Sequence, residues 1–192
     1  KGVVTCGDCS DLERCSTAGK ILENDPSALE NLKGQGKICK GEWKDMGILD
    51  KLKKSNRVDS KIEDMARKNS DTAINYAKSF QKKFDYSSNS IEALEEILDY
   101  YSKDLSKSSP TENQIWSMAL IFGSYLGEVM LKNGLLKNRF FWKTDNTSNI
   151  PVLSDDCGNH IAPVDKVYKR LVNGMEDNIT SFYKFIMDAH YK

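Results

Sequence analysis

The chain has little that would identify an enzyme or a membrane protein. Its 28 Lys and Arg residues balance 28 Asp and Glu residues, so no net charge draws it towards nucleic acid or an anionic membrane. No apolar run reaches the roughly 18 to 20 residues that a membrane-spanning helix needs. The sequence has only two histidines, and it lacks a Gly-rich phosphate loop, a nucleophile elbow and a His-Glu-x-x-His pattern. These absences argue against catalysis, against a membrane span and against nucleic-acid binding driven by overall charge.

What the sequence does have is a cluster of cysteines near its start. Four of the five cysteines are separated by two, five and 23 residues: Cys6, Cys9, Cys15 and Cys39. A Cys-x2-Cys pair is a common zinc knuckle, and two further thiolates complete a tetrahedron. Residues 1–44 have little periodic apolar character, so a metal would supply the folding energy that a small core lacks. We expect a cysteine-rich module over residues 1–44 that holds one structural zinc ion through these four residues.

The segments "CGDCSDLERC" and "CKGEW" resemble short zinc-binding segments of bacterial and phage proteins, with a longer spacer before Cys39. Two other interpretations of the cysteines are a redox centre and a disulfide framework. A redox centre would need its Cys-x-x-Cys after a buried strand, and "KGVV" is too short for one. A disulfide framework requires an exported protein. The odd number of cysteines favours a reducing cytoplasm, whereas a start at Lys1 leaves a removed leader and an exported, disulfide-bonded form open.

The remainder of the chain predicts an α+β fold, a helical bundle packed on a small three-stranded antiparallel meander. Residues 45–58 form a polar connector, and residues 59–192 form the α+β domain. Apolar spacing of three and four residues predicts helices near 60–84, 91–105 and 110–133, and two more after Pro163. Alternation predicts strands at 139–145, 150–156 and 159–164.

Local signals predict where two of these helices begin and end. Ser60 with Glu63 fits a capping box for the first helix. Ser109 as N-cap, with Pro110 and Glu112, fits the start of the third, and Asn133-Gly134 fits its end. Small residues recur every four positions on this third helix, at Ala119, Gly123 and Gly127, and predict that a helix or the sheet packs very close to it.

The second half of the chain resembles a group of small bacterial α+β domains. The resemblance covers about 70 residues, from 113 to 182, through "GSYLGEVMLKN", "FFWKTD" and "HIAPVDKVYKRLVNGMED". Members of that group occur beside polymorphic-toxin genes as presumed immunity proteins. The resemblance implies a non-enzymatic protein that binds and neutralises a cognate bacterial toxin, and it implies no catalytic residues.

Acidic residues are the first candidates for such a contact. We expect the acidic face of the second helix and the strand loops to meet the partner, through Glu92, Glu95, Glu96, Asp99, Asp145, Asp155 and Asp156. Cys157 and His160 have the spacing of a metal knuckle, but "DCGN" is also an ordinary polar turn. Glu128, inside the apolar third helix, is expected to pair with Lys132, Arg139 or Arg170.

An alternative function is a zinc-containing adaptor that regulates or binds nucleic acid. Its basis is a group of basic residues near the cysteines: Lys33, Lys37, Lys40, Lys44, Lys51, Lys53, Lys54 and Arg57. Phosphate binding by such a group would weaken steeply as salt rises.

Overall fold

The computed structural model describes residues 59–190, apart from the side chain of Ser106. The chain divides into two units, Lys1–Asp45 and Met46–Lys192, and all described residues belong to the second. The predicted zinc module and the connector lie outside the described residues, so both stay predictions.

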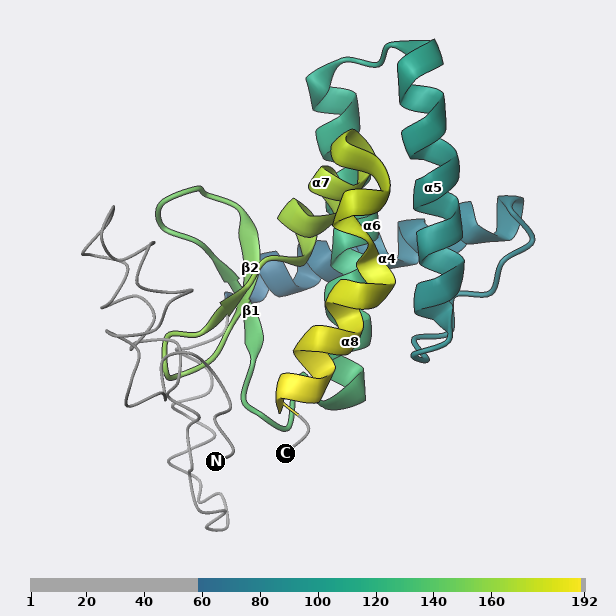
Figure 1. Ribbon diagram of the computed structural model, residues 1–192. Coiled ribbons are helices and arrows are strands. Elements are labelled where there is room, and N and C mark those ends of the chain that lie inside the picture. The colour runs from purple at the N-terminus through teal and green to yellow at the C-terminus, as the bar shows by residue number, and fades with distance from the viewer. Residues whose placement is uncertain (1–58, 191–192) are drawn as a thin grey trace, which may run out of the picture. The chain divides into compact units, whose positions relative to one another are not determined.

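The described residues form the expected α+β fold (Figure 1). Five α-helices are joined by short connections and one small antiparallel sheet. In chain order the elements are α4 (Ser60–Ser79), α5 (Ser90–Ser108), α6 (Glu112–Met130), the π-helical turn η3 (Leu131–Leu135), β1 (Phe141–Thr144), β2 (Pro151–Ser154), β3 (His160–Ile161), α7 (Pro163–Asn173), the 3-10 turn η4 (Gly174–Asp177) and α8 (Ile179–His190). Within this range no helix is long and apolar enough to cross a membrane.

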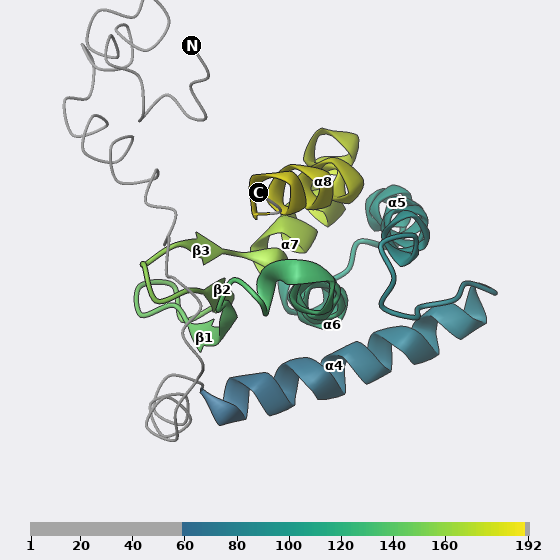
Figure 2. The same ribbon diagram turned by 90° about the horizontal axis from the view of Figure 1, so that it is seen from below.

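Helix α6 is the centre of the domain. Figure 2 shows it end-on, with α4, α5, α7 and the sheet arranged around it. Every residue of α6 from Phe122 to Met130 is buried, which explains why its apolar residues cover more than one face. A helix that is contacted on all sides cannot show a single apolar stripe.

The stripe of small residues on α6 has the predicted role. A Cβ atom at Gly123 would lie 2.5 Å from the Cα of Val164, at the start of α7. A Cβ atom at Gly127 would lie 2.3 Å from the ring of Trp142, on β1. A helix and the sheet therefore both approach α6 closely, one at each glycine.

The ends of the helices differ from the predicted ones. Asp59, rather than Ser60, is the N-cap of α4, and its carboxylate accepts from the backbone N–H groups of Lys61 and Ile62. Ser109 terminates α5 in a left-handed conformation instead of starting the next helix. Thr111 is the N-cap of α6 and forms a capping box with Gln114.

At its other end, α6 stops at Met130, and the turn η3 follows it to Leu135. The helical backbone is broken at Gly134, whose φ and ψ are not helical, so the predicted break at Asn133-Gly134 is present within this turn. The side-chain amide of Asn133 donates to the carbonyl oxygens of Val129 and Tyr86, both at 2.8 Å. Asn133 therefore joins this turn to the loop before α5, a tertiary role that its local sequence does not show.

The three strands pair as the predicted meander, in the order β1-β2-β3. Trp142 is opposite Leu153, and Leu153 is opposite Ile161. The third strand is shorter than expected because Pro163 already begins α7. Proline is favoured in the first turn of a helix, where its missing N–H costs no hydrogen bond. At its other end, α7 is capped by Gly174 in a conformation with positive φ.

Candidate functional site

Glu95, one of the predicted contact residues, is committed to the interior. One carboxylate oxygen accepts from Arg170 Nε of α7 at 2.7 Å, and the other accepts from the backbone N–H of Ile179 at 2.7 Å. Ile179 is the first residue of α8, where backbone N–H groups have no partner within the helix. Glu95 therefore holds α7 and α8 against α5.

Arg170 is the cation at the centre of this cluster, and its side chain is fully buried. Its Nη2 donates to Asp99 at 3.0 Å and to the sulfur of Met175 at 3.3 Å. Its Nη1 has no hydrogen-bond partner among the described residues. A buried guanidinium loses its hydration, and the carboxylates of Glu95 and Asp99 compensate for that loss.

Asp99 divides its carboxylate between an exposed and a buried cation. Lys103, four residues later on α5, pairs with one oxygen at 2.5 Å, and Arg170 pairs with the other. Hydrogen bonds from Lys103 and then from Arg170 hold the pKa of Asp99 below its usual value. Asp99 therefore stays ionised, but most of its bonding capacity is used within the domain.

The outward face of α5 presents a different set of side chains. Glu92, Glu96 and Tyr100 are four residues apart and all are exposed; we call them the α5 stripe. Glu96 pairs with Lys82 from the loop before the helix, and 62% of the Glu96 side chain remains accessible. Tyr100 is 57% exposed.

Aromatic rings from α4 extend this surface. Phe80, which follows α4, packs edge-on against Tyr100, with ring centroids 5.3 Å apart. Phe80 meets Tyr101 in the same way at 5.6 Å. Tyr76 on α4 is 45% exposed, and its ring contacts Phe122 of α6. The α5 stripe is thus bordered by aromatic side chains anchored in the core, which gives it a firm base.

The acidic residues of the strand loops stabilise their own turns. Asp145 accepts from the backbone N–H and the hydroxyl of Ser148, and these bonds lower its pKa, with the hydroxyl as the first cause. Asp155 accepts from the backbone N–H groups of Cys157 and Asn159. Asp156 pairs with Arg139 at 3.2 Å. None of the three carboxylates is presented without an internal bond.

Cys157 and His160 lie on the turn between β2 and β3 and on β3 itself. Gly158 between them has φ of +87°, a left-handed conformation typical of a tight turn. Cys157 is disulfide-bonded and is the only cysteine among residues 59–190. No group of three or more potential metal ligands occurs in this part of the chain. The geometry fits the polar-turn interpretation of this segment.

Glu128 does not pair with any of the three expected cations. It is 7% exposed, and its carboxylate accepts from the indole N–H of Trp142 at 2.9 Å. The amino group of Lys132 lies 3.2 Å from the ring centroid of Tyr86 instead. Glu128 therefore joins α6 to β1 through a neutral donor. The role is structural, as expected, with a different partner.

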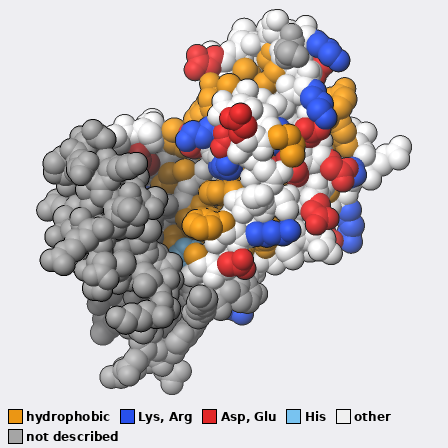
Figure 3. Space-filling view, viewed as in Figure 1, with side chains coloured by type: hydrophobic (Ala, Val, Ile, Leu, Met, Phe, Trp, Pro, Cys, Tyr) orange, Lys and Arg blue, Asp and Glu red, His pale blue; other side chains and the backbone are white. Residues whose placement is uncertain are grey.

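Two features of this region could not be found from the sequence alone. Arg170 and Glu95 are 75 residues apart, and no local spacing links them. The apolar spacing leaves Tyr100 off the core face of its helix, but it does not show that Phe80, from the end of the preceding helix, packs against its ring. In space, charged side chains of both signs alternate over the surface of α5, α7 and α8, with hydrophobic side chains between them (Figure 3).

Comparisons with known proteins add no relationship to this description. No protein-family model matches the chain. No curated protein and no solved structure matches it either.

Proposed function

We propose that this chain is a non-enzymatic protein-binding protein, and specifically an immunity protein that neutralises a cognate bacterial toxin. The observation that carries the proposal is the α5 stripe of Glu92, Glu96 and Tyr100 with its neighbouring aromatic residues. Tyrosine is enriched at the energetic centres of protein interfaces, where a rigid ring fills a pocket on the partner. Two accessible carboxylates beside such a ring favour a partner whose contact surface is basic.

This surface is a smaller version of the acidic face predicted from the sequence. Of the predicted acids, Glu92, Glu96 and Asp156 are exposed. Glu95 and Asp99 bond to Arg170, so Glu92 and Glu96 are the two acids of α5 that a partner can reach. A nuclease toxin suits this chemistry because its substrate groove must be basic to bind phosphates. The exposed tyrosine supplies the apolar contact that charges alone would not give.

The test is capture of the toxin encoded by a neighbouring gene, followed by matched substitutions. Tyr100→Ala is expected to weaken the complex about tenfold to thirtyfold, the usual cost of truncating an interface anchor. Glu96→Lys is expected to weaken it by a similar factor, mainly through slower association. Affinity is measured by titration calorimetry and the rates by surface plasmon resonance.

Matched controls lie on α8. Phe185→Ala removes a 71% exposed ring, and Asp188→Lys reverses an exposed charge. Both variants should bind as the wild type does. The proposal fails if no neighbouring gene product forms a complex, or if the α8 variants weaken binding as much as the α5 variants do.

We also propose the structural zinc ion at Cys6, Cys9, Cys15 and Cys39. The disulfide at Cys157 competes with this site, because the chain has only four other cysteines and a thiol in a disulfide is not a zinc ligand. The four-cysteine site therefore requires the reduced protein. Protein purified under reducing conditions is expected to contain one zinc per chain by mass spectrometry. The four thiols should resist alkylation until a chelator removes the metal. Metal-free protein with rapidly alkylated thiols would contradict the proposal.

The adaptor alternative can be tested with the same purified protein, by measuring its binding to nucleic acid. Binding of labelled DNA or RNA that weakens steeply with salt would favour it over the toxin partner. We expect no such binding, because the chain carries no net positive charge to hold phosphates.

A further inference from the structure

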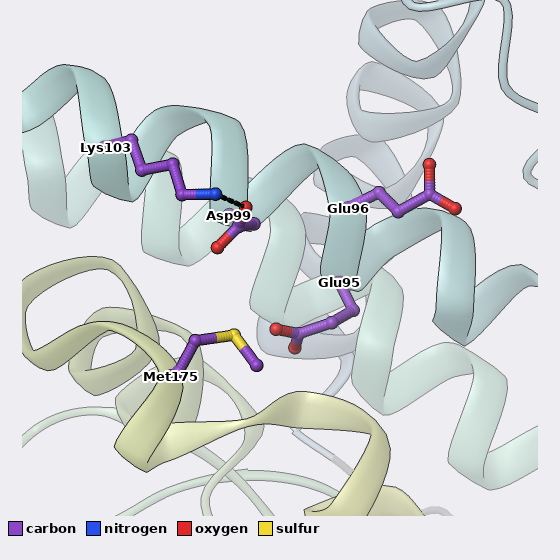
Figure 4. Close-up of a pocket in the computed structure, with 5 residues that line it drawn as sticks. All are labelled: Glu95, Glu96, Asp99, Lys103 and Met175. Carbon is purple, nitrogen blue, oxygen red and sulfur yellow. Dashed lines mark hydrogen bonds and ion pairs between the residues drawn. The ribbon is translucent and has the colours of Figure 1, made fainter.

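Met175 borders a hollow between α5 and η4. The hollow measures about 660 Å³ and is lined by Met175 together with Glu95, Glu96, Asp99 and Lys103. Figure 4 shows the Met175 side chain directed into the space between the carboxylates of Glu95 and Asp99. The residue is 63% exposed. Its thioether therefore adjoins both solvent and the buried ion cluster.

The sulfur of Met175 has an unusual partner. It accepts from Nη2 of Arg170 at 3.3 Å, and Arg170 is fully buried with its Nη1 unpaired in the described structure. A thioether is a weak acceptor, whereas a guanidinium is a strong cationic donor. The Arg170 guanidinium thus has fewer strong acceptors than its charge and burial require.

Exposure separates Met175 from the other methionines between residues 59 and 190. Met130 and Met187 are buried, and Met65 and Met118 are partly buried. Oxidation of methionine depends on access of the oxidant to the sulfur. A peroxide in solution therefore reaches Met175 first among them.

We propose that Met175 is an oxidation site whose sulfoxide strengthens the Arg170 cluster. A hydroperoxide transfers one oxygen atom to the sulfur: its O–O bond breaks, an S=O bond forms, and water or an alcohol leaves. The sulfur loses two electrons and the peroxide gains them. The sulfoxide oxygen is a strong acceptor, and the hollow has room for it beside the guanidinium. Oxidation converts a weak N–H···S contact into a charge-assisted N–H···O bond.

The consequence reaches three helices because Arg170 joins them. Its partners Glu95 and Asp99 belong to α5, it belongs to α7 itself, and Glu95 also holds the first N–H of α8. Strengthening this cluster should slow the opening of η4 and α8. The inference concerns the domain itself and does not depend on the proposed toxin.

The experiment treats the full chain with dilute hydrogen peroxide and follows each methionine by peptide mass spectrometry. Met175 is expected to oxidise about tenfold faster than Met65 or Met118. The melting temperature should rise by about 3 °C, and amide exchange in residues 175–183 should slow. Methionine sulfoxide reductase should reverse both changes.

Two variants keep the test decisive. Met175→Leu preserves volume but cannot be oxidised at this position, so it should not show the rise in melting temperature that oxidation of Met175 gives the wild type. Met175→Gln places an amide oxygen near the guanidinium and should reproduce the rise without peroxide. Equal oxidation of Met65, Met118 and Met175 would overturn the proposal. So would an oxidised protein whose melting temperature stays constant, falls, or changes equally in Met175→Leu.

Discussion

Arg170→Ala is expected to lower the free energy of unfolding by about 3 to 5 kcal/mol, the usual cost of removing one partner from a buried ion pair. The substitution leaves Glu95, whose side chain is 13% exposed, without its cation. It also removes one of the two cations that bond to Asp99. Urea denaturation followed by circular dichroism measures the loss, and α8 should show the largest increase in amide exchange because Glu95 holds its first N–H.

The matched control is Arg139→Ala. Arg139 also pairs with an aspartate, Asp156 at 3.2 Å, but its side chain is 61% exposed. Exposed ion pairs contribute about 0 to 1 kcal/mol, so this variant should unfold close to the wild type. Equal losses in the two variants would contradict the argument that burial makes Arg170 important. If Arg170→Ala gives no folded protein, Arg170→Lys can be used instead. It keeps the charge but replaces the planar guanidinium and its several donors by one ammonium group, so the free energy of unfolding should fall by a smaller, measurable amount.

The same cluster gives the domain a pH dependence with a definite sign. The pKa of Asp99 is lowered in the folded state by Lys103 and Arg170. A carboxyl group with a lowered folded pKa adds stability above its unfolded value, about 3.9, and loses it as the pH falls through the folded value. The difference in unfolding free energy between wild type and Arg170→Ala should therefore be full at pH 6 and shrink below pH 4.

The sequence predicts the architecture of this domain well where burial is repetitive. The spacing of Leu94, Ile97 and Leu98 in α5 reflects a face that packs against α7 and α8. The alternation around Trp142 in β1 reflects a face that packs against α6. Such faces leave a periodic signal because every turn or every second residue meets the same environment. The α+β order of helices, meander and helices follows directly from these signals.

Helix ends were predicted less well, for a local reason. Asp59 and Ser60 are both good N-caps, and the same is true of Ser109 and Thr111. The choice between neighbours depends on backbone angles set by the incoming chain, which is extended at Thr111 and left-handed at Ser109. Where two good N-cap residues lie close together, the sequence does not tell which of them begins the helix. Either residue alone would indicate the start.

The sequence does not tell which residues of the acidic run on α5 are accessible. Glu92, Glu95, Glu96 and Asp99 form one acidic run, and only tertiary structure separates Glu95 and Asp99, which bond to Arg170, from Glu92 and Glu96, which remain accessible. The separation depends on α7, which follows after the whole meander. A charge on a helix surface has no local signature that tells whether a distant cation covers it.

Gly123→Ala is the second substitution with a large expected effect, and the direction in which it changes the free energy of unfolding is informative. Alanine normally stabilises a helix interior by about 1 kcal/mol relative to glycine. At Gly123 the new Cβ would lie 2.5 Å from the Cα and 3.0 Å from the N of Val164, and 3.1 Å from the carbonyl oxygen of Pro163. These are backbone atoms at the start of α7 and cannot rotate away. We expect a net loss of about 3 kcal/mol or more, because α7 must move outwards from α6.

Two variants on the same helix isolate that cause. Ser117→Ala, at an exposed position of α6, tests helix propensity alone and should be neutral or slightly stabilising. Gly127→Ala meets the Trp142 ring at 2.3 Å, and Trp142→Ala made in addition should recover part of the Gly127→Ala loss by opening that space. No such relief exists for Gly123, since its neighbours are backbone atoms. If Gly123→Ala were as stable as the wild type, α6 and α7 would have to lie farther apart than these distances allow. The close approach of the two helices would then not be the reason for glycine at this position.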